Sequence, residues 1–153
     1  MVTDNDSFEF LELINTASQA IDLTGVQLVQ VDVGGDSQGI NFDFAAQMLN
    51  PSERIVVVEN LVAFQSRYGT SVRVADGDDG QGGPGGQYGG KLSNNGERLT
   101  LLDGSGQVIQ QFTYDDTGQW PVLAVGNVST LEVIDMEGNF DEANNWRSSI
   151  DFF

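Results

Sequence analysis

Short stretches of alternating apolar and polar residues, separated by turn residues, recur along most of the chain. Such period-two placement is typical of β-strands, in which successive side chains point to opposite faces of a sheet. The stretch at residues 26–33 is the clearest, because Val29, Val31 and Val33 share one face. Strands are also expected around Phe42 and Phe44 and at residues 8–14, 53–60, 71–75, 98–103, 107–114 and 130–135, whereas residues 138–149 are expected to be irregular.

Two of these stretches are apolar on both faces. Residues 8–14 carry apolar side chains in both alternating sets, and residues 55–58 are all β-branched. A strand of this kind is expected where both faces of a sheet are covered. The pattern therefore predicts a central strand at residues 8–14 and a buried strand at residues 53–60.

One segment has a helical period instead. Leu61, Phe64 and Tyr68 are spaced at i, i+3 and i+7, so they share one face of an α-helix. Asn60 is a suitable N-cap, and Gly69 is a suitable residue at which to end the helix. The sequence predicts a helix at residues 61–68, the only helix of note.

Residues 76–90 are rich in glycine and aspartate and contain no aliphatic side chain. A segment of this composition is expected to form a long loop outside the core that is mobile at its centre. Shortening it at residues 80–86 is expected to cost less than about 1 kcal/mol, since closure entropy depends only logarithmically on loop length.

About eight or nine strands with one short helix predict an all-β sandwich, and 153 residues are typical of one domain. We expect residues 1–153 to be a single domain cut from a longer chain. Period-two placement on two stacked sheets predicts a buried set of side chains. Its members are Leu11, Leu13, Val26, Leu28, Ile55, Val57, Leu99, Leu101, Leu131 and Trp146.

The chain is strongly acidic, with 6 basic and 23 acidic residues and a net charge of −17. Nucleic-acid binding requires a basic protein surface that replaces the counterions around phosphate, so we do not expect a nucleic acid as partner. An anionic membrane repels an acidic protein surface, so we do not expect membrane binding either. The sequence contains no run of 18 apolar residues, so it predicts no membrane span. Residues 1–7 lack the features of a signal peptide. The acidity itself is typical of a solubility device, or of a surface that binds a hard cation such as Ca²⁺.

Cysteine and histidine are both absent. This excludes a disulfide framework, a thiolate zinc site, a cysteine nucleophile and a Ser-His-Asp triad.

Four groups of motifs occur in an order and spacing that cover nearly the whole chain. They are Glu9-Phe10-Leu11-Glu12-Leu13 with the turn Asp22-Leu23-Thr24-Gly25; Leu49-Asn50-Pro51-Ser52-Glu53-Arg54-Ile55-Val56-Val57-Val58 with Arg67-Tyr68-Gly69; Leu92-Ser93-Asn94-Asn95-Gly96-Glu97-Arg98-Leu99-Thr100-Leu101-Leu102-Asp103; and Leu131-Glu132 through Asn144-Asn145-Trp146. Together they resemble the bacterial branch of the lamin tail domain family, and the motif at residues 92–97 is the most distinctive.

The resemblance implies an immunoglobulin-like β-sandwich that is not catalytic. In bacteria such domains resemble accessory modules of secreted or surface proteins, often beside nucleases or other hydrolases, and in animal lamins the related domain mediates nuclear protein contacts. It thus implies an extracellular or cell-surface location, adjacent domains in the same chain, and a protein or carbohydrate surface as the partner. The long Gly-rich segment at residues 76–90 departs from the family pattern.

Two candidate binding sites follow from the residues themselves. Asp76, Asp78 and Asp79 place three carboxylates within four positions and could bind Ca²⁺, the alternative being a solvated loop. Tyr88 and Trp120 could form an aromatic platform for a sugar or a peptide, the alternative for Trp120 being a cap on one end of the sandwich.

Two acid pairs, Asp115 with Asp116 and Asp141 with Glu142, could hydrolyse a glycoside if their carboxylates were suitably spaced. Adjacent acids in loops are more often solvated turn residues. The favoured hypothesis is a non-catalytic accessory binding module of unknown ligand, and the alternatives are a small carboxylate hydrolase or a Ca²⁺-stabilised adhesion-type module.

Overall fold

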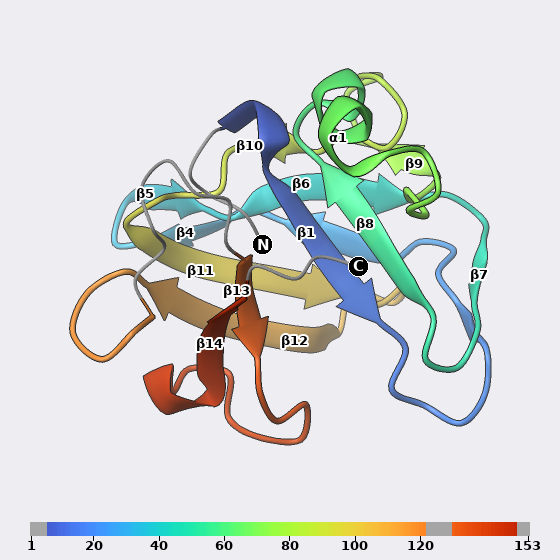
Figure 1. The fold of residues 1–153 in the computed structure, drawn as a ribbon. Helices are drawn as coiled ribbons and strands as arrows, with labels where there is room; N and C mark the ends of the chain where they lie inside the picture. The colour runs from blue at the N-terminus through green and yellow to red at the C-terminus, as the bar shows by residue number, and fades with distance from the viewer. Residues whose placement is uncertain (1–5, 122–129, 150–153) are drawn as a thin grey trace.

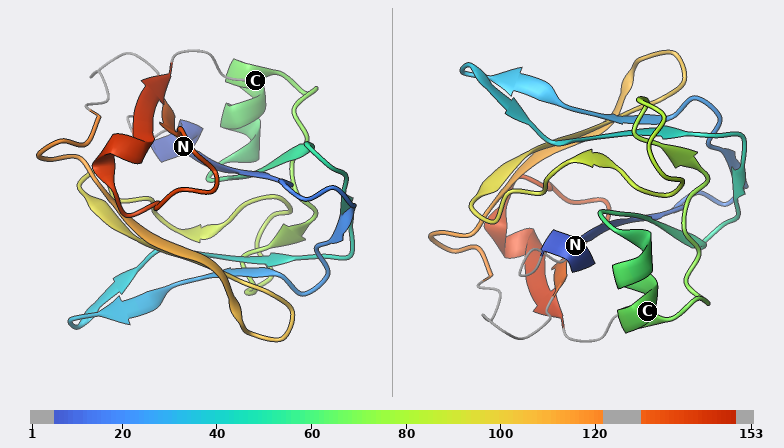
Figure 2. Two further views of the ribbon diagram at one scale, coloured as in Figure 1. Left: turned by 90° about the horizontal axis from the view of Figure 1, so that it is seen from below. Right: turned by 90° about the horizontal axis from the view of Figure 1, so that it is seen from above.

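The computed structural model describes residues 6–121 and 130–149 of the chain. These residues form short β-strands, a single α-helix and two turns of 3-10 helix, η1 (Asp6–Phe8) and η2 (Ala143–Asn145). The strands lie in two layers, as the views along the sheets show (Figures 1 and 2). The predicted all-β architecture with one short helix is confirmed.

The larger layer is one antiparallel sheet. Its strands, in spatial order, are β10 (Gly89–Gly90), β6 (Ile40–Phe44), β3 (Gln27–Val29), β11 (Gly96–Leu102) and β12 (Val108–Asp115), with β9 (Gly77–Asp78) also paired to β6. The β11–β12 pair is the longest ladder, running from Gly96 opposite Asp115 to Leu102 opposite Val108.

The second layer consists of separate strand pairs. They are β1 (Phe10–Ile14) with β8 (Arg54–Val58) and β13 (Thr130–Val133) with β14 (Trp146–Ser149). Figure 1 places β13 between β14 and β1, and both pairs lie on the same side of the larger sheet as the helix (Figure 2). Two small strand pairs complete the strands: β2 (Ile21–Asp22) with β7 (Met48–Leu49), which are distant in the sequence, and the hairpin of β4 (Val31–Val33) with β5 (Asp36–Gln38).

The β1–β8 pair carries apolar side chains on both faces, because each face packs against another part of the protein. The face toward the larger sheet packs into the main core through Leu11, Leu13, Ile55 and Val57. The other face packs against helix α1 (Leu61–Tyr68) in a second cluster of Phe10, Val56, Val58 and Phe64. The predicted burial is confirmed for β8, whose residues 55–58 are all buried, but in β1 only Phe10 is fully buried and the other four residues are partly exposed. Strand β1 is also not central, because among the described residues it pairs only with β8.

Most of the predicted core set is buried. Val26, Leu28, Ile55, Val57, Leu99 and Leu131 are each at most 6% exposed. The remaining four, Leu11, Leu13, Leu101 and Trp146, are partly buried against the same cluster. They lie near the space between β1 and β13, where no strand covers them among the described residues.

The helix begins and ends as the sequence predicts. The Asn60 side-chain oxygen accepts a hydrogen bond from the Ala63 amide at 3.0 Å, and the Gly69 amide donates to the Gln65 carbonyl at 2.9 Å. These bonds satisfy backbone groups that a helix leaves unpaired at its two ends. The helix buries Phe64 against the outer face of β8.

Three strand predictions are wrong in part. Residues 26–33 do not form one strand, because the chain leaves the sheet at Gln30, whose amide donates to the Asn41 side chain. Residues 71–75 contribute a single bridge, from Val74 to Val56, in place of a strand. The segment predicted to be irregular at residues 138–149 contains strand β14. Each difference depends on a partner distant in the sequence.

The prediction that residues 76–90 lie outside the core is wrong. Strands β9 and β10 pair with β6, and Tyr88 is only 6% exposed. The Gly86 amide donates to the Gly77 carbonyl, and the Gly86 carbonyl accepts from the Val58 amide at 3.0 Å. Because glycine has no side chain, its backbone can lie directly on the sheet and replace side-chain packing with hydrogen bonds.

Leu99→Ala is expected to cost about 2–5 kcal/mol of unfolding free energy, because it removes the contacts of a side chain that is 2% exposed in the main core. Val62→Ala is the control, since Val62 is 80% exposed on α1. Chemical denaturation of both variants measures the contrast. A loss at Leu99 no larger than that at Val62 would contradict the assigned core.

Gly77→Ala is expected to cost roughly 2–4 kcal/mol, the sum of an unfavourable positive φ and a steric clash. A Cβ at this position would lie 2.1 Å from the Asp43 carbonyl oxygen. Gly82→Ala is the matched control, because Gly82 also has a positive φ but has open space around it. Equal losses in denaturation experiments would show that the segment does not dock on β6.

Candidate functional site

An apolar groove of about 410 Å³ lies in the second layer, between β1 and β13. Leu11, Leu13 and Ile14 line it from β1, and Leu131 and Val133 line it from β13. Its floor is formed by the larger sheet, through Leu28, Leu99, Leu101 and Phe112. The groove exists because β1 and β13 are neighbours that do not pair with each other in the described part of the chain.

A β-bulge in β12 shapes one wall of this groove. The pairing of β11 with β12 steps from Leu101 opposite Gln110 to Leu102 opposite Val108, so it passes over Ile109. The extra residue places Ile109 in the groove wall, where it remains 52% exposed. Val108 is 57% exposed but does not line the groove. Bulges commonly redirect a side chain in this way.

Aromatic side chains close one end of the groove. Trp146 packs on Phe112 with ring centroids 5.3 Å apart, and its indole N–H donates to the Phe140 carbonyl at 2.8 Å. Trp120 lies against Trp146, with centroids 6.0 Å apart. This position corresponds to the cap predicted as the alternative for Trp120, and its binding of a ligand stays a prediction.

Two ion pairs lie at the groove. Arg54 pairs with Glu12 at 2.6 Å, and Arg147 pairs with Glu132 at 3.4 Å. The two arginine side chains are half or more exposed, so each pair contributes at most about 1 kcal/mol to stability. They leave the centre of the groove apolar.

Tyr88 is not part of an open aromatic platform. Its ring is buried, and its hydroxyl donates to the Glu9 carboxylate at 3.0 Å. The Leu92 amide donates to the same carboxylate oxygen at 3.3 Å. The predicted platform of Tyr88 with Trp120 is therefore wrong for Tyr88, which anchors the end of the Gly-rich segment beside β1.

A second buried carboxylate, Glu97, ties the distinctive polar turn to the sheet. It accepts hydrogen bonds from the Ser93 amide at 2.9 Å and from the Gly39 amide at 3.0 Å. The Tyr114 hydroxyl donates to the Ser93 carbonyl at 2.6 Å. Sequence reasoning did not single out Glu9 or Glu97 as buried, although an acid between two phenylalanines was a signal for Glu9.

These carboxylates perturb the neighbouring phenols. Burial raises the pKa of Tyr88, and the negative charge of Glu9 raises it further. Burial raises the pKa of Tyr114 in the same way, with Glu97 as the nearest contributing charge. Both phenols are consequently neutral hydrogen-bond donors over the whole range of ordinary pH. Their hydroxyls bond to buried groups of the protein itself, so both have a structural role.

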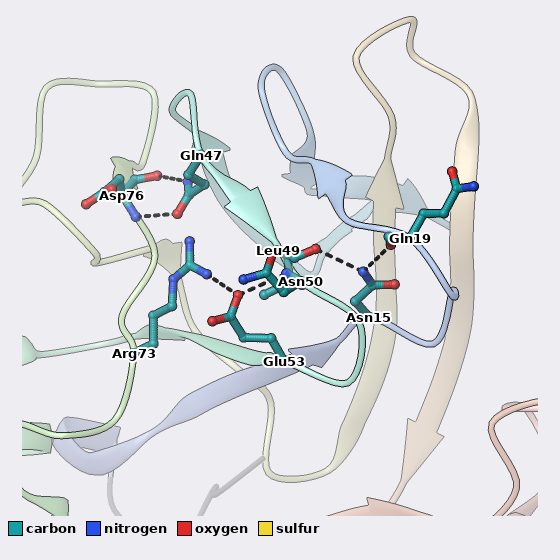
Figure 3. Close-up of polar contacts among 8 residues, drawn as sticks. All are labelled: Asn15, Gln19, Gln47, Leu49, Asn50, Glu53, Arg73 and Asp76. Carbon is teal, nitrogen blue, oxygen red and sulfur yellow. Dashed lines mark hydrogen bonds and ion pairs between the residues drawn. The ribbon is translucent and has the colours of Figure 1, made fainter.

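The three aspartates proposed to bind Ca²⁺ have separate roles. Gln47 holds the Asp76 backbone, donating to its carbonyl at 2.6 Å and accepting from its amide at 3.0 Å (Figure 3). Asp78 accepts from the Gly80 amide, and Asp79 accepts from the Gln81 and Gly83 amides. Within the described ranges, no three acidic, histidine or cysteine side chains converge on one point. Ca²⁺ binding by Asp76, Asp78 and Asp79 stays a prediction.

Polar side chains also hold the loop that follows β1. The Asn15 side-chain amide donates to the Gln19 and Leu49 carbonyls, both at 2.9 Å, and Glu53 pairs with Arg73 (Figure 3). The buried Asn15 therefore fixes the turn that follows β1 against β7.

The two acid pairs proposed as catalytic candidates each contain an aspartate that accepts backbone hydrogen bonds. Asp115 accepts hydrogen bonds from the Asp116 and Thr117 amides and from the Thr117 hydroxyl, and the bond from the Asp116 amide is the main cause of its lowered pKa. Asp141 accepts from the Thr113 amide at 2.8 Å. A glycosidase needs one carboxyl with a raised pKa as its acid, so Asp115 has the opposite property.

Comparison with known proteins gives one family. The Lamin Tail Domain family model matches residues 1–116 of the chain. No curated protein and no solved structure matches the sequence significantly. In the described ranges, none of the helices is long and apolar enough to cross a membrane.

Replacing Tyr88 or Tyr114 by Phe is expected to reduce the fall of the unfolding free energy with pH in the alkaline range. Unfolded tyrosine ionises near pH 10, whereas the folded phenols stay neutral, so above that pH the unfolded state binds fewer protons. The unfolding free energy should therefore fall with rising pH, by a total of about 1.4 kcal/mol for each phenol between about pH 9 and pH 11. Denaturation at several pH values between about 9 and 11 measures this slope.

The control for this experiment is Phe42→Leu, a core substitution without a titrating group. It should lower stability at every pH and keep the wild-type slope. An unchanged slope in both tyrosine variants would contradict the buried position of the two hydroxyls.

Proposed function

The chain belongs to the lamin tail domain family, and from this premise we propose that it is a non-catalytic module that binds a partner protein through the groove between β1 and β13. Domains of this family are immunoglobulin-like interaction modules. The family and the fold class expected from the sequence are thereby confirmed. The partner, its location and the absence of catalysis in this chain are the proposal.

The exposed apolar lining of the groove is the observation that carries the proposal. Ile109 and Met136 both line it and are 52% and 38% exposed. Exposed apolar surface that is concave and bordered by charged residues is typical of an interaction site. The groove is also wide enough to accept side chains, since it encloses about 410 Å³.

We further propose that the domain is an accessory part of a larger exported or surface protein. The resemblance to the bacterial branch of the family supports this setting. The net charge of −17 is compatible with an exposed apolar groove, because like charge keeps copies of the domain from associating with one another. A carbohydrate surface is the second candidate partner, favoured by the partly exposed Trp120 at the end of the groove.

The hydrolase hypothesis has less support. Asp115 and Asp141 accept hydrogen bonds from backbone amides of their own turn or of β12, which gives both carboxylates a structural role. The buried Glu9 and Glu97 are closed off from solvent by their tyrosine and amide partners. Turnover of a glycan that is abolished by Asp115→Asn or Asp141→Asn would overturn the non-catalytic assignment.

Ile109→Asp is expected to reduce partner binding at least tenfold, because it places a charge in the apolar wall of the groove. Val108→Asp is the matched control, with the same charge change at an adjacent and equally exposed position outside the groove. The wild type and both variants would be immobilised and exposed to cell-surface and secreted proteins of the source organism, with quantitative mass spectrometry of what each retains.

The proposal expects at least one protein to be retained by the wild type and Val108→Asp but lost with Ile109→Asp. Identical retention by all three proteins would contradict the groove as the binding site. Circular dichroism and denaturation of the variants establish that each is folded.

A further inference from the structure

We propose that the groove binds its partner by β-strand addition, with an extended segment of the partner paired between β1 and β13. This inference rests on the proposed function and specifies how recognition occurs. It predicts a partner segment with alternating apolar side chains and basic residues at its ends.

The outer edge of β1 offers backbone groups for pairing. The Asn15 amide donates to the Glu53 carbonyl and the Glu59 amide donates to the Glu9 carbonyl, so odd-numbered residues of this strand bond to β8. Backbone direction alternates along an antiparallel strand, which turns the amides and carbonyls of Glu12 and Ile14 away from β8. These groups lie along the groove.

Strand β13 presents the matching edge from the other side. The Ile134 amide donates to the Asn145 carbonyl at 2.7 Å, so even-numbered residues of β13 bond to β14. The amides and carbonyls of Leu131 and Val133 therefore point away from β14. Because β13 lies between β14 and β1, these groups face the groove (Figure 1).

The strand edges of β1 and β13 and the floor of the groove together determine which partner segment can bind. Among the described residues no strand pairs with the outer edge of β1 or of β13, and unpaired strand edges are templates for another chain. Successive side chains of an added strand would point alternately to the floor and to solvent. Since Leu28, Leu99 and Leu101 form that floor, every second side chain of the segment should be apolar.

Charge selects the kind of partner. The domain carries 23 acidic and 6 basic residues, so its field attracts basic segments and repels a second copy of itself. At the groove, Glu12 and Glu132 stand beside the two strand edges, each with one arginine partner. A segment with lysine or arginine at its ends is the occupant that this field favours.

Synthetic peptides test the backbone pairing directly. The first peptide alternates valine and threonine between terminal lysines, and the second has the same side chains with N-methyl groups on every second backbone amide. Strand addition predicts that the first binds at least tenfold more tightly in calorimetry, because N-methylation removes the donors of one edge. Equal affinities of the two peptides, or no binding of either, would overturn the proposal.

Amide hydrogen exchange by NMR locates the added strand. Binding of the first peptide should slow exchange at Glu12, Ile14, Leu131 and Val133 by tenfold or more. Protection of these amides in the dilute isolated domain would mean that the chain itself fills the groove. Protection that appears only with rising protein concentration would mean that a second copy does. Either outcome overturns a partner segment as the occupant.

Ile14→Pro is the matched domain variant. It removes an outward amide while leaving the bonds between β1 and β8 in place, a position where an edge strand tolerates proline. Peptide binding should fall at least tenfold, and unchanged binding by the folded variant would count against the proposal. If the peptides fail but protein retention still depends on Ile109, strand addition is wrong and the groove-binding function stands.

Discussion

The burial of the β1–β8 pair on both faces is the constraint on which the rest of the structure depends. One face packs on the larger sheet and the other on α1. With both faces covered, the pair can meet other chains only through its edges. The edge of β8 is bridged by Val74 and Gln87, whereas the edge of β1 borders the groove. In the described part of the chain, the architecture thus leaves two strand edges of the second layer, those of β1 and β13, at a concave apolar surface.

Buried carboxylates hold the connecting segments to this framework. Glu9 binds Tyr88 and the Leu92 amide, and Glu97 binds the Ser93 and Gly39 amides. A buried acid is costly unless hydrogen bonds compensate it, and here each acid joins segments that are far apart in sequence. The long loops can therefore follow the sandwich closely without apolar side chains of their own.

For the Gly-rich segment at residues 76–90, the amino-acid composition predicted one property correctly and one wrongly. Its lack of aliphatic residues correctly indicated that it would add little apolar surface to the core. It wrongly indicated separation from the sheet, because Gly77 and Gly86 form backbone hydrogen bonds at close approach. A substitution for Gly77 would meet the Asp43 carbonyl, so the glycines are required by packing as much as by turns.

The sequence by itself determined the elements whose signals are local: the helix with its Asn60 cap, the two-sided apolar strands, the family motifs and the acidity. Periodicity and capping depend on neighbouring residues, so they can be read without a fold. Only the tertiary structure decided that β1 pairs with β8 alone among the described residues, that Tyr88 is buried against Glu9, and that the bulge places Ile109 in the groove wall. These features depend on strand pairing and register between distant segments, which the alternation of apolar residues does not specify.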